Sequence, residues 1–337
     1  MPETPRRFIR DLRASERVAG AYSISNAQMG RTRNDKSYLR CLIGDRTGEV
    51  PGRMWSIEEA AFGQLPTDGF VYLEGETQAY QGELQLIIQR IEAIDPAPEQ
   101  LRDLVPCSAR DPEEMFAELK AVLATLEHPA MQALAESFLA DDMLMVAFRR
   151  APAAKSMHHA YLGGLLEHTL SLMKLASAVC PLYPKINRDL VVIGLFLHDM
   201  GKTRELVYDK AFAYSDRGEL VGHIVEGAYM LRAKAESVMR EKGLRFPAGA
   251  VLVLEHIILS HHAVPEFGAV KVPATPEAIM VAILDNLDAK TTMALAAARP
   301  DHLPANLGGN FTERQWALDT KLFRPDPLKP AAPPAER

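Results

Sequence analysis

The sequence is poor in cysteine and lacks any long apolar run. Its three cysteines, Cys41, Cys107 and Cys180, form no close pair, which argues against a disulfide framework and against a cysteine-based zinc site. The longest candidate apolar run, Val191–Leu197, is far too short to cross a bilayer. The first residues, MPETPRRFIRDLRAS, have no apolar core of the kind found in secretory signals. We therefore expect a soluble protein of the reducing cytoplasm, without membrane association.

The sequence also lacks a glycine-rich phosphate-binding loop, internal repeats and an excess of positive charge. Its formal net charge is -6, so any basic surface for nucleic acid would have to be local. In other respects the composition, 47% hydrophobic and 24% charged, is that of an ordinary globular protein. The length of 337 residues suits two or three domains.

Residues 18 to 94 have the pattern of β structure, with short apolar runs separated by Gly and Asp turn signals. The Asp45–Gly48 and Ala79–Gly82 stretches are predicted turns, with Gly48 suited to a positive φ. Five short strands favour a small closed barrel of the OB type, and a small open sandwich is the alternative. The predicted strands are Val18–Ile24, Tyr38–Asp45, Glu49–Trp55, Phe70–Glu76 and Leu84–Ile94.

A proline-rich break at Asp95–Pro98 is followed by helical periodicity up to about residue 322. Asp111 and Pro112 are typical of a helix start. The predicted helices are 112–127, 130–149, 157–180, 188–199, 223–242, 248–262 and 276–299. The predicted domain organisation is an OB-like domain over 1–95, a helical connector over 96–150, an all-α domain over 151–322 and a disordered, proline-rich tail over 323–337.

Histidine is concentrated in one part of the chain. Eight of the ten histidines lie between positions 158 and 262, and the β segment has none. His198 and Asp199 follow the apolar stretch Leu190–Leu197 and precede Gly201, which can end a helix. Such a helix would hold two metal-binding side chains on a rigid scaffold. A lone His-Asp pair is more often an incidental helix end, so the interpretation depends on the other candidates.

Further donors stand on predicted helices. His168 has Leu165 and Leu172 at helical spacing, although a lone histidine there is more often a core residue. Asp285 follows Val281 by one turn, and a carboxylate buried there is costly unless it is paired or bound to a metal.

Three more histidines lie on the predicted helix that ends near residue 262, and a fourth lies at the start of the preceding helix. His223 follows Gly222 at a predicted helix start. His256 and His261 are about 140° apart around their helix, so they need not bind the same ion. Which of His256, His261 and His262 faces a metal stays open.

The order of these residues resembles the HD phosphohydrolase superfamily, whose pattern is H…HD…D. With the β segment in front, the chain from about residue 18 to 300 is similar to the YhaM-type 3′→5′ exoribonucleases. The stretches that carry the resemblance are His158–His168, Leu197–Lys202, Gly222–His223, Ile258–His262 and Ile283–Lys290.

The resemblance implies a metal-dependent phosphodiesterase with one or two divalent ions, Mn²⁺ or Co²⁺. A first ion would be held by His168, the His198-Asp199 pair and Asp285, and Asp199 would bridge to a second ion. The predicted metal ligands are His168, His198, Asp199, His223, His256, His261 and Asp285. Nitrogen and oxygen donors without sulfur suit Mn²⁺, Fe²⁺, Co²⁺ or Ni²⁺ better than a structural zinc site.

Two residues are predicted to act in catalysis. Asp199 would bridge the ions that activate water and clamp the reacting phosphate. Lys202 lies one turn beyond the doublet and could neutralise a phosphate oxygen, or simply favour the helix dipole.

The β segment has local basic and aromatic residues although its charge is balanced. The predicted nucleic-acid contacts are Arg31, Arg33, Lys36, Arg40, Tyr38 and Trp55, with Tyr22 and Tyr80 as further aromatic candidates. The alternative is that Tyr38 and Trp55 only fill the barrel.

The leading hypothesis is a 3′→5′ exoribonuclease that degrades single-stranded RNA, and single-stranded DNA is a further candidate substrate. An HD nucleotidase or cyclic-nucleotide phosphodiesterase is the second hypothesis. A non-catalytic nucleic-acid-binding or regulatory protein is the third. The resemblance also implies a homo-oligomer.

Overall fold

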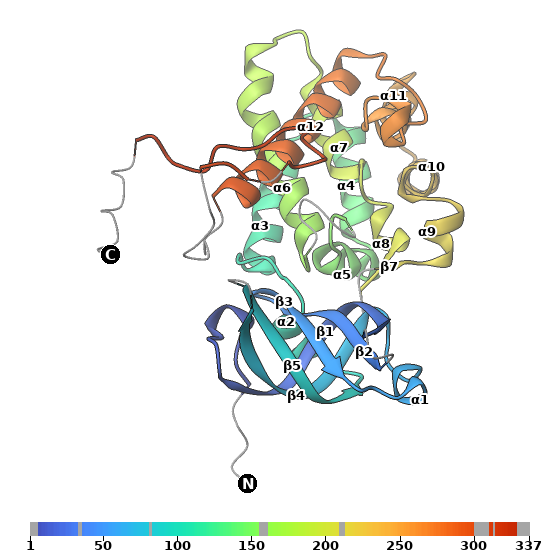
Figure 1. The fold of residues 1–337 in the computed structure, drawn as a ribbon. Coiled ribbons are helices and arrows are strands. Elements are labelled where there is room, and N and C mark those ends of the chain that lie inside the picture. Colours follow the sequence, from blue (N-terminus) through green and yellow to red (C-terminus); the bar gives the residue numbers. More distant parts are fainter. Residues whose placement is uncertain are drawn as a thin grey trace.

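A β-barrel and a helical unit are stacked end to end in the computed structural model (Figure 1). The structure describes residues 6–32, 36–80, 83–154, 161–208, 213–299, 310–312 and 314–328. The barrel comes from the N-terminal part of the chain and the helices from the remainder, so the predicted fold class is confirmed.

The barrel closes through five strands in the order β1-β2-β3-β5-β4. Neighbouring strands are antiparallel except for β3 and β5, which are parallel. Their bounds are β1 Arg17–Arg31, β2 Ser37–Asp45, β3 Gly48–Trp55, β4 Gly69–Tyr80 and β5 Glu83–Ala93. This is the strand number and closure of an OB-like barrel, as predicted.

Strand β1 is longer than the predicted Val18–Ile24, because it continues past a bulge and pairs with both β4 and β2. Residues 17–24 pair with β4, and residues 23–31 pair with β2 on both sides of an irregularity between Ser25 and Gln28. Asn26, inside the irregularity, has a φ of 58°. A bulge bends the strand and increases its twist, so β1 can pass from one side of the barrel to the other.

Alternating side chains fill the barrel. Tyr22, Leu39 and Leu86 are fully buried, while Arg40 and Trp55 point outward. The β2–β3 turn is the predicted one, and Gly48 has a φ of 154°. Residues 81–82 of the second predicted turn lie outside the described residues.

Helix α2, Pro98–Leu104, joins the barrel to the helices. The sequence pattern did not predict this helix. Leu101, Leu104 and Val105 pack against Phe70 of β4, and Leu162 of the helical unit is packed against the same cluster. This small apolar cluster therefore contacts both units.

The helical unit has one continuous apolar core from α3 to α12. Its principal helices are α3 Pro112–Leu123, α4 Pro129–Leu139, α5 Asp142–Arg150, α6 Gly164–Val179, α7 Arg188–Leu197, α10 His223–Lys242, α11 Ala250–Ser260 and α12 Pro276–Ala298. The predicted single helix 130–149 is wrong, because it is divided at Asp141. The Asp141 carboxylate accepts a hydrogen bond from Leu144 N at 3.1 Å and thus starts α5 as its N-cap.

Shorter elements complete the helical unit. They are α8 Lys202–Glu205, α9 Asp216–Leu220, the two-stranded sheet of β6 Leu206–Val207 and β7 Ala213–Tyr214, and the single turns η2 Cys180–Leu182 and η3 Pro265–Phe267. In the barrel, the short elements are η1 Ile9–Asp11 and α1 Glu59–Phe62. Among the described residues, no helix combines the length and apolar character needed to cross a membrane.

The predicted tail is only partly described. Arg324 N donates to Asn310 O at 2.9 Å, and the Phe311 and Phe323 rings lie 5.4 Å apart, so the start of the predicted disordered segment is paired with residues 310–312. Residues 329–337 lie outside the described residues, as do His158, His159 and His302.

A close backbone contact fixes the loop after α7 against α10. A Cβ atom at Gly201 would lie 2.0 Å from the carbonyl oxygen of His223, so only glycine fits there. We expect Gly201→Ala to lower the free energy of unfolding by about 1–3 kcal/mol through overpacking, measured by urea denaturation. Gly227→Ala is the control, because its Cβ would meet nothing closer than 3.4 Å. Equal stability of the two variants would contradict this view of the loop.

Candidate metal centre

Five helices bring histidines and carboxylates to one point inside the helical unit. His168 lies in α6, His198 ends α7, His223 opens α10 and His261 ends α11. Asp285 and Asp288 project from α12, and Asp199 directly follows His198. The donors are therefore fixed by helix ends and by the packed core between them.

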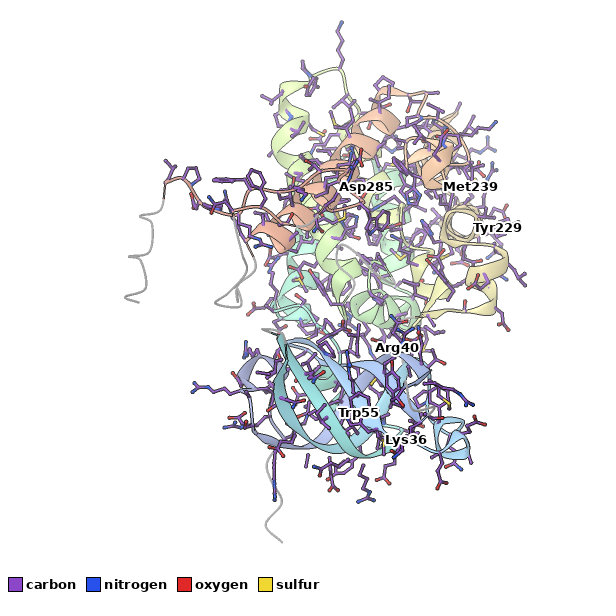
Figure 2. The ribbon with its side chains drawn as sticks, viewed as in Figure 1. Lys36, Arg40, Trp55, Tyr229, Met239 and Asp285 are labelled. Atoms are coloured by element: carbon purple, nitrogen blue, oxygen red, sulfur yellow. The ribbon has the colours of Figure 1, made fainter. Side chains whose placement is uncertain are left out.

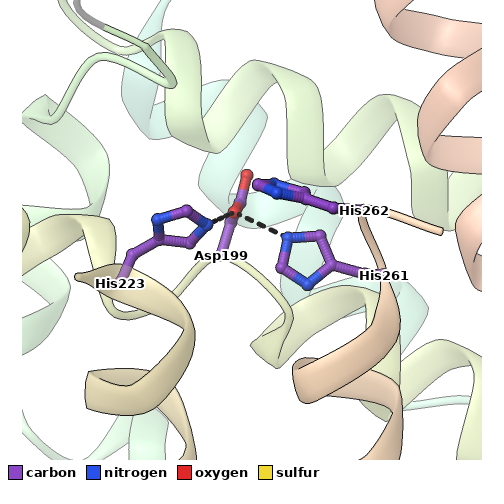
Figure 3. A group of neighbouring side chains, drawn as sticks. All are labelled: Asp199, His223, His261 and His262. Atoms are coloured by element: carbon purple, nitrogen blue, oxygen red, sulfur yellow. Dashed lines mark ion pairs between the residues drawn. The ribbon is translucent and has the colours of Figure 1, made fainter. Parts of the chain in front are cut away.

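The Asp199 carboxylate is the centre of this arrangement. Its Oδ1 lies 3.5 Å from His223 Nε2 and 3.4 Å from His261 Nε2. Its Oδ2 lies 3.4 Å from His198 Nε2 and 4.0 Å from His168 Nε2. Figure 3 shows the His223 and His261 rings approaching Asp199 from two sides. The two oxygens thus face two different groups of histidines.

These groups are separate sets of metal-type donors. The donor atoms of His168, His198 and Asp285 lie within 4.8 Å of one another, and so do those of Asp199, His223, His261 and His262. Asp285 Oδ1 is 3.1 Å from His168 Nε2. Six of the seven predicted ligands come together, and Asp199 faces both groups.

His256 is the predicted ligand that the structure does not bring to the centre. Its Nε2 instead accepts a hydrogen bond from Ala274 N at 2.8 Å, in the chain that leads to α12. His262 stands in the second group in its place. The turn at the end of α11 directs both His261 and His262 inward, which regular helical spacing alone did not predict.

Hydrogen bonds fix the tautomer of these histidines. Nδ1 of His198, His261 and His262 lies 2.7–2.8 Å from the backbone carbonyls of Leu195, Ile258 and Phe267, respectively. A carbonyl oxygen can only accept, so Nδ1 carries the proton and Nε2 keeps its lone pair. This is the form in which imidazole binds a metal.

Carboxylates hold two further histidines in the same way. Asp288 Oδ2 is 2.8 Å from His168 Nδ1, and Glu205 Oε1 is 2.9 Å from His223 Nδ1. Glu205 also accepts from the backbone N of His223 at 2.9 Å. Carboxylate partners of this kind orient histidine ligands and raise their basicity. Asp288 and Glu205 were not predicted from the sequence, although Asp288 lies three residues after Asp285 and thus on the same side of its helix.

The donor atoms that face inward have the character expected of metal ligands. The Nε2 atoms of His198, His223 and His261 and the Oδ1 of Asp199 are buried and have no hydrogen-bond partner within the described part of the chain. Buried polar atoms are costly without partners. Because these atoms converge on the same space, a divalent ion fits the site chemically.

The charges of the centre agree with this interpretation. Burial opposes ionisation of Asp199, but Lys202 and His198 lower the pKa of its carboxyl group well below its usual range. Burial likewise opposes ionisation of Asp285, whereas its hydrogen bond to His168 lowers its pKa. Both carboxylates are therefore ionised at neutral pH.

The surroundings shift the pKa values of the histidines in opposite directions. Burial lowers the pKa of His198 to about 4, and burial with the neighbouring His261 lowers that of His262 to about 3. Burial also acts to lower the pKa of His168, but hydrogen bonds to Asp285 and Asp288 outweigh it and raise the pKa to about 9. His198 and His262 are thus neutral near pH 7 and available as ligands.

Lys202 lies within the centre rather than at an exposed helix end. Its Nζ is 2.6 Å from Asp199 Oδ2, and the residue is buried. Burial acts to lower its pKa, but the Asp199 charge outweighs burial and raises it. Lys202 therefore stays protonated and provides positive charge beside the donor cluster.

The predicted nucleic-acid residues of the barrel form an outward-facing group. Tyr38 of β2 and Trp55 of β3 are cross-strand neighbours with ring centroids 5.3 Å apart, and Trp55 is 47% exposed. Arg40 is exposed beside them, directly opposite Arg53. Figure 2 shows Lys36, Arg40 and Trp55 on the same side of the barrel.

The remaining barrel candidates are placed differently. Arg31 ends β1 and forms an exposed ion pair with Glu59 at 3.6 Å. Tyr22 is fully buried, and its hydroxyl donates to Arg7 O at 2.6 Å, so its prediction as a stacking residue was wrong. Arg33 and the side chain of Tyr80 lie outside the described residues.

Comparisons with known proteins bear on both units. Residues 165–290 match the model of the HD domain. The chain is 33% identical over 321 residues to the 3′-5′ exoribonuclease YhaM of Shouchella clausii (strain KSM-K16), and this match covers 94% of the chain and 95% of that protein.

Two solved structures were also matched. The second OB-fold domain of replication protein A from Methanococcus maripaludis is 15% identical, with a TM-score of 0.21, and the match covers 28% of this chain and 98% of that one. RecG bound to a three-way DNA junction is 15% identical, with a TM-score of 0.24 and coverage of 85% and 36%. These scores are too low to bear on the fold, which rests on the strand order of the barrel. By its identity with a full-length relative and its HD-domain match, the chain belongs to the family of the 3′-5′ exoribonuclease YhaM.

Proposed function

We propose that this protein is a metal-dependent 3′→5′ exoribonuclease that degrades single-stranded RNA. The observation that carries the proposal is the Asp199 carboxylate, with one oxygen facing His223 and His261 and the other facing His168 and His198. A carboxylate between two donor groups is suited to bridging two ions. The exoribonuclease YhaM, which aligns over nearly the whole chain, supports the choice of RNA and of direction.

The ligands that we propose follow the two groups. His168, His198 and Asp285 with Asp199 would hold one divalent ion, and His223, His261 and His262 with Asp199 would hold the second. Nitrogen and oxygen donors without sulfur suit Mn²⁺, Co²⁺, Fe²⁺ or Ni²⁺, and the family resemblance favours Mn²⁺ or Co²⁺ among these. When bound, such ions acidify a water molecule and stabilise charge on the phosphate that is attacked.

The protein's own residues position this chemistry. Asp288 and Glu205 orient the His168 and His223 rings through Nδ1. Lys202 keeps Asp199 ionised and can neutralise charge that develops on a phosphate oxygen beside it. The apolar core around the helices keeps the donors rigid, so little reorganisation is needed when substrate arrives.

We propose that the barrel binds the strand through Tyr38, Trp55 and Arg40. Bases stack on exposed aromatic rings, and arginines contact the phosphates. Arg40 stands directly opposite Arg53, so two positive charges meet across this strand pair. Single-stranded DNA offers the same base faces and phosphates and is the expected second substrate. We further propose a cytoplasmic location, consistent with three free cysteines, and a homo-oligomeric state.

The central test uses a 5′-labelled single-stranded RNA of about 20 nucleotides, long enough to span a barrel and the metal centre. In Mn²⁺ we expect a ladder of products that shortens from the 3′ end and disappears with EDTA. Asp199→Asn should lower turnover by more than about 100-fold, because it removes the bridging charge. The asparagine keeps an acceptor for Lys202, and circular dichroism checks that the fold is retained.

Two outcomes would contradict the proposal. Full activity of Asp199→Asn would remove Asp199 from the metal centre. Intact RNA with every metal, combined with hydrolysis of mononucleotides or cyclic nucleotides, would indicate a small-nucleotide phosphohydrolase instead.

The carboxylate behind His168 gives a separate prediction. Asp288→Ala should weaken Mn²⁺ binding by about 10–100-fold, because the His168 ring loses the acceptor that orients it. Asp288→Asn keeps an acceptor and should lose less. Isothermal titration calorimetry measures both, and the exposed Asp142 provides the control Asp142→Ala. Unchanged affinity in Asp288→Ala would show that the ring is held by its other contacts.

The barrel proposal is tested through the two tryptophans of the chain. Trp55→Ala should weaken binding of single-stranded RNA by about 5- to 150-fold, the equivalent of 1–3 kcal/mol of stacking. Trp316, which is 77% exposed in the C-terminal segment, gives the control Trp316→Ala. Fluorescence anisotropy in EDTA measures binding without hydrolysis, and equal affinities for the two variants would remove Trp55 from the strand-binding surface.

A further inference from the structure

A cleft of about 780 Å³ lies where the barrel meets the helical unit. Its lining includes four arginines from three different segments: Arg46 from the β2–β3 turn, Arg110 before α3, and Arg149 and Arg150 at the end of α5. Among the described residues, Asp111 is the only acidic one in its lining. We call this cavity, with its four arginines, the arginine cleft.

The anionic partners of these arginines lie outside the lining. Arg110 pairs with Glu118 at 2.6 Å, Arg149 with Glu113 at 2.6 Å, and Arg46 with Asp103 at 3.4 Å. These three carboxylates are not among the lining residues, so none of them occupies the cleft itself.

Two further charges of opposite sign, Asp111 and Arg150, line the cleft. Asp111 is engaged as the N-cap of α3, where it accepts from Glu113 N and Glu114 N. Arg150 is exposed and lies 6.0 Å from the centre of the Tyr208 ring, and no ion pair joins it to a carboxylate in the part of the chain that the structure describes. The interior of the arginine cleft is therefore suited to an anion with several oxygens.

The arginine cleft lies between the two parts of the proposed machinery. Arg46 follows β2, the strand that carries Tyr38 and Arg40 on the outer surface of the barrel. On the other side, Gly163 lines the cleft and precedes α6, and His168 follows five residues later, about 7.5 Å along the helix axis. In the view of Figure 2, Arg40 lies nearer to the helical unit than Lys36 and Trp55 do.

Backbone hydrogen bonds hold the walls of the cleft in a fixed relation. Ser108 N donates to Leu162 O at 2.9 Å, and Leu162 N donates to Pro106 O at 2.9 Å. Gly163 N donates to Arg150 O at 3.0 Å. The connection after α2 and the start of α6 are thus joined directly, and the arginines of both units face a preformed space.

We propose that the arginine cleft binds phosphates of the RNA strand on its way from the barrel to the metal centre. The proposal rests on the proposed exoribonuclease function. Several arginines along a groove follow a nucleic-acid backbone without reading its sequence. The cleft would hold the part of the strand upstream of the bond that is cleaved.

Arg150→Ala and Arg46→Ala test the proposal with the full-length protein. Removal of Arg150 orphans no carboxylate, and Asp103 keeps Arg6 as a partner at 3.8 Å when Arg46 is removed. Each variant should bind a 5′-fluorescent single-stranded RNA of about 20 nucleotides about fivefold more weakly at 0.1 M salt, and the slope of log K against log salt should fall by about 0.7. Anisotropy in EDTA measures both quantities.

The matched control is Arg240→Ala, on the exposed surface of α10, where Arg240 pairs only with its neighbour Glu241 among the described residues. It should bind RNA like the wild type. A second readout is Mn²⁺-dependent hydrolysis of bis(p-nitrophenyl) phosphate, a small diester that reaches only the metal centre. Loss of kcat/KM in the arginine variants should be greater for the RNA than for this diester.

The outcomes separate the two proposals. Unchanged RNA affinity and salt slope in both arginine variants, with normal binding by the wild type, would overturn the role of the cleft alone. Equal losses with RNA and with the small diester would also overturn it, because the arginines would then act on the metal centre. Failure of the wild type to bind RNA, while it still hydrolyses the diester, would overturn the exoribonuclease function as well.

Discussion

The buried negative charge of Asp199 is the constraint on which the helical unit depends. The residue is 3% exposed, and a carboxylate removed from water to this extent is tolerated only with compensation by cations or hydrogen-bond donors. Lys202 supplies one positive charge at 2.6 Å. His198 and His261 have their lone pairs on Nε2, because Nδ1 of each is hydrogen-bonded to a carbonyl, so they cannot donate to the carboxylate from Nε2. A divalent cation that these histidines share with Asp199 would supply further compensation.

This requirement explains why the donors stand at helix ends. Residues inside a helix are directed by its regular spacing, whereas His198 and His261 each follow the last turn of a helix and can face a common centre. Their Nδ1 atoms then bond to carbonyls three residues earlier, which have no partner in the helix. The same contact therefore completes the helix end and sets the tautomer for metal binding. Gly201 adds the close backbone approach that places α10, and with it His223, beside Asp199.

The sequence predicted those features that depend on residue type and local order. Strand number, the β2–β3 turn and the group of His168, His198, Asp199 and Asp285 follow from apolar spacing and from a specific family pattern. The exchange of His256 for His262 did not, because it depends on how the chain turns after Ser260, beyond the regular helix. The break at Asp141 was also not predicted, because the apolar pattern continues across it. The break depends on the Asp141 carboxylate, which caps α5 and accepts a hydrogen bond from Lys234.

Residues that act through others are the least visible in a sequence. Asp288 and Glu205 are acidic residues on helices, and such residues are most often solvated. Their role appears only when the fold places them behind His168 and His223. The arginine cleft has the same character, because its four arginines are up to 104 positions apart in sequence and meet only where two units are joined.

A protein with a net charge of -6 repels nucleic acid at long range, so binding must come from local fields. The structure separates the charges accordingly. Carboxylates at the centre are directed at histidines, and carboxylates near the unit junction are paired with arginines of the cleft. Arginines therefore gather at the barrel surface and at the cleft, while the carboxylate charge of the centre is kept where a cation is needed. The apolar cluster around α2 and the backbone hydrogen bonds at Leu162 fix the junction between the units. The arginines of the cleft and the carboxylates of the metal centre therefore stay at a constant separation. A strand held by its phosphates on the barrel side would then bring its end to the ionised carboxylates, where bound metal ions would offset the repulsion between the two negative groups.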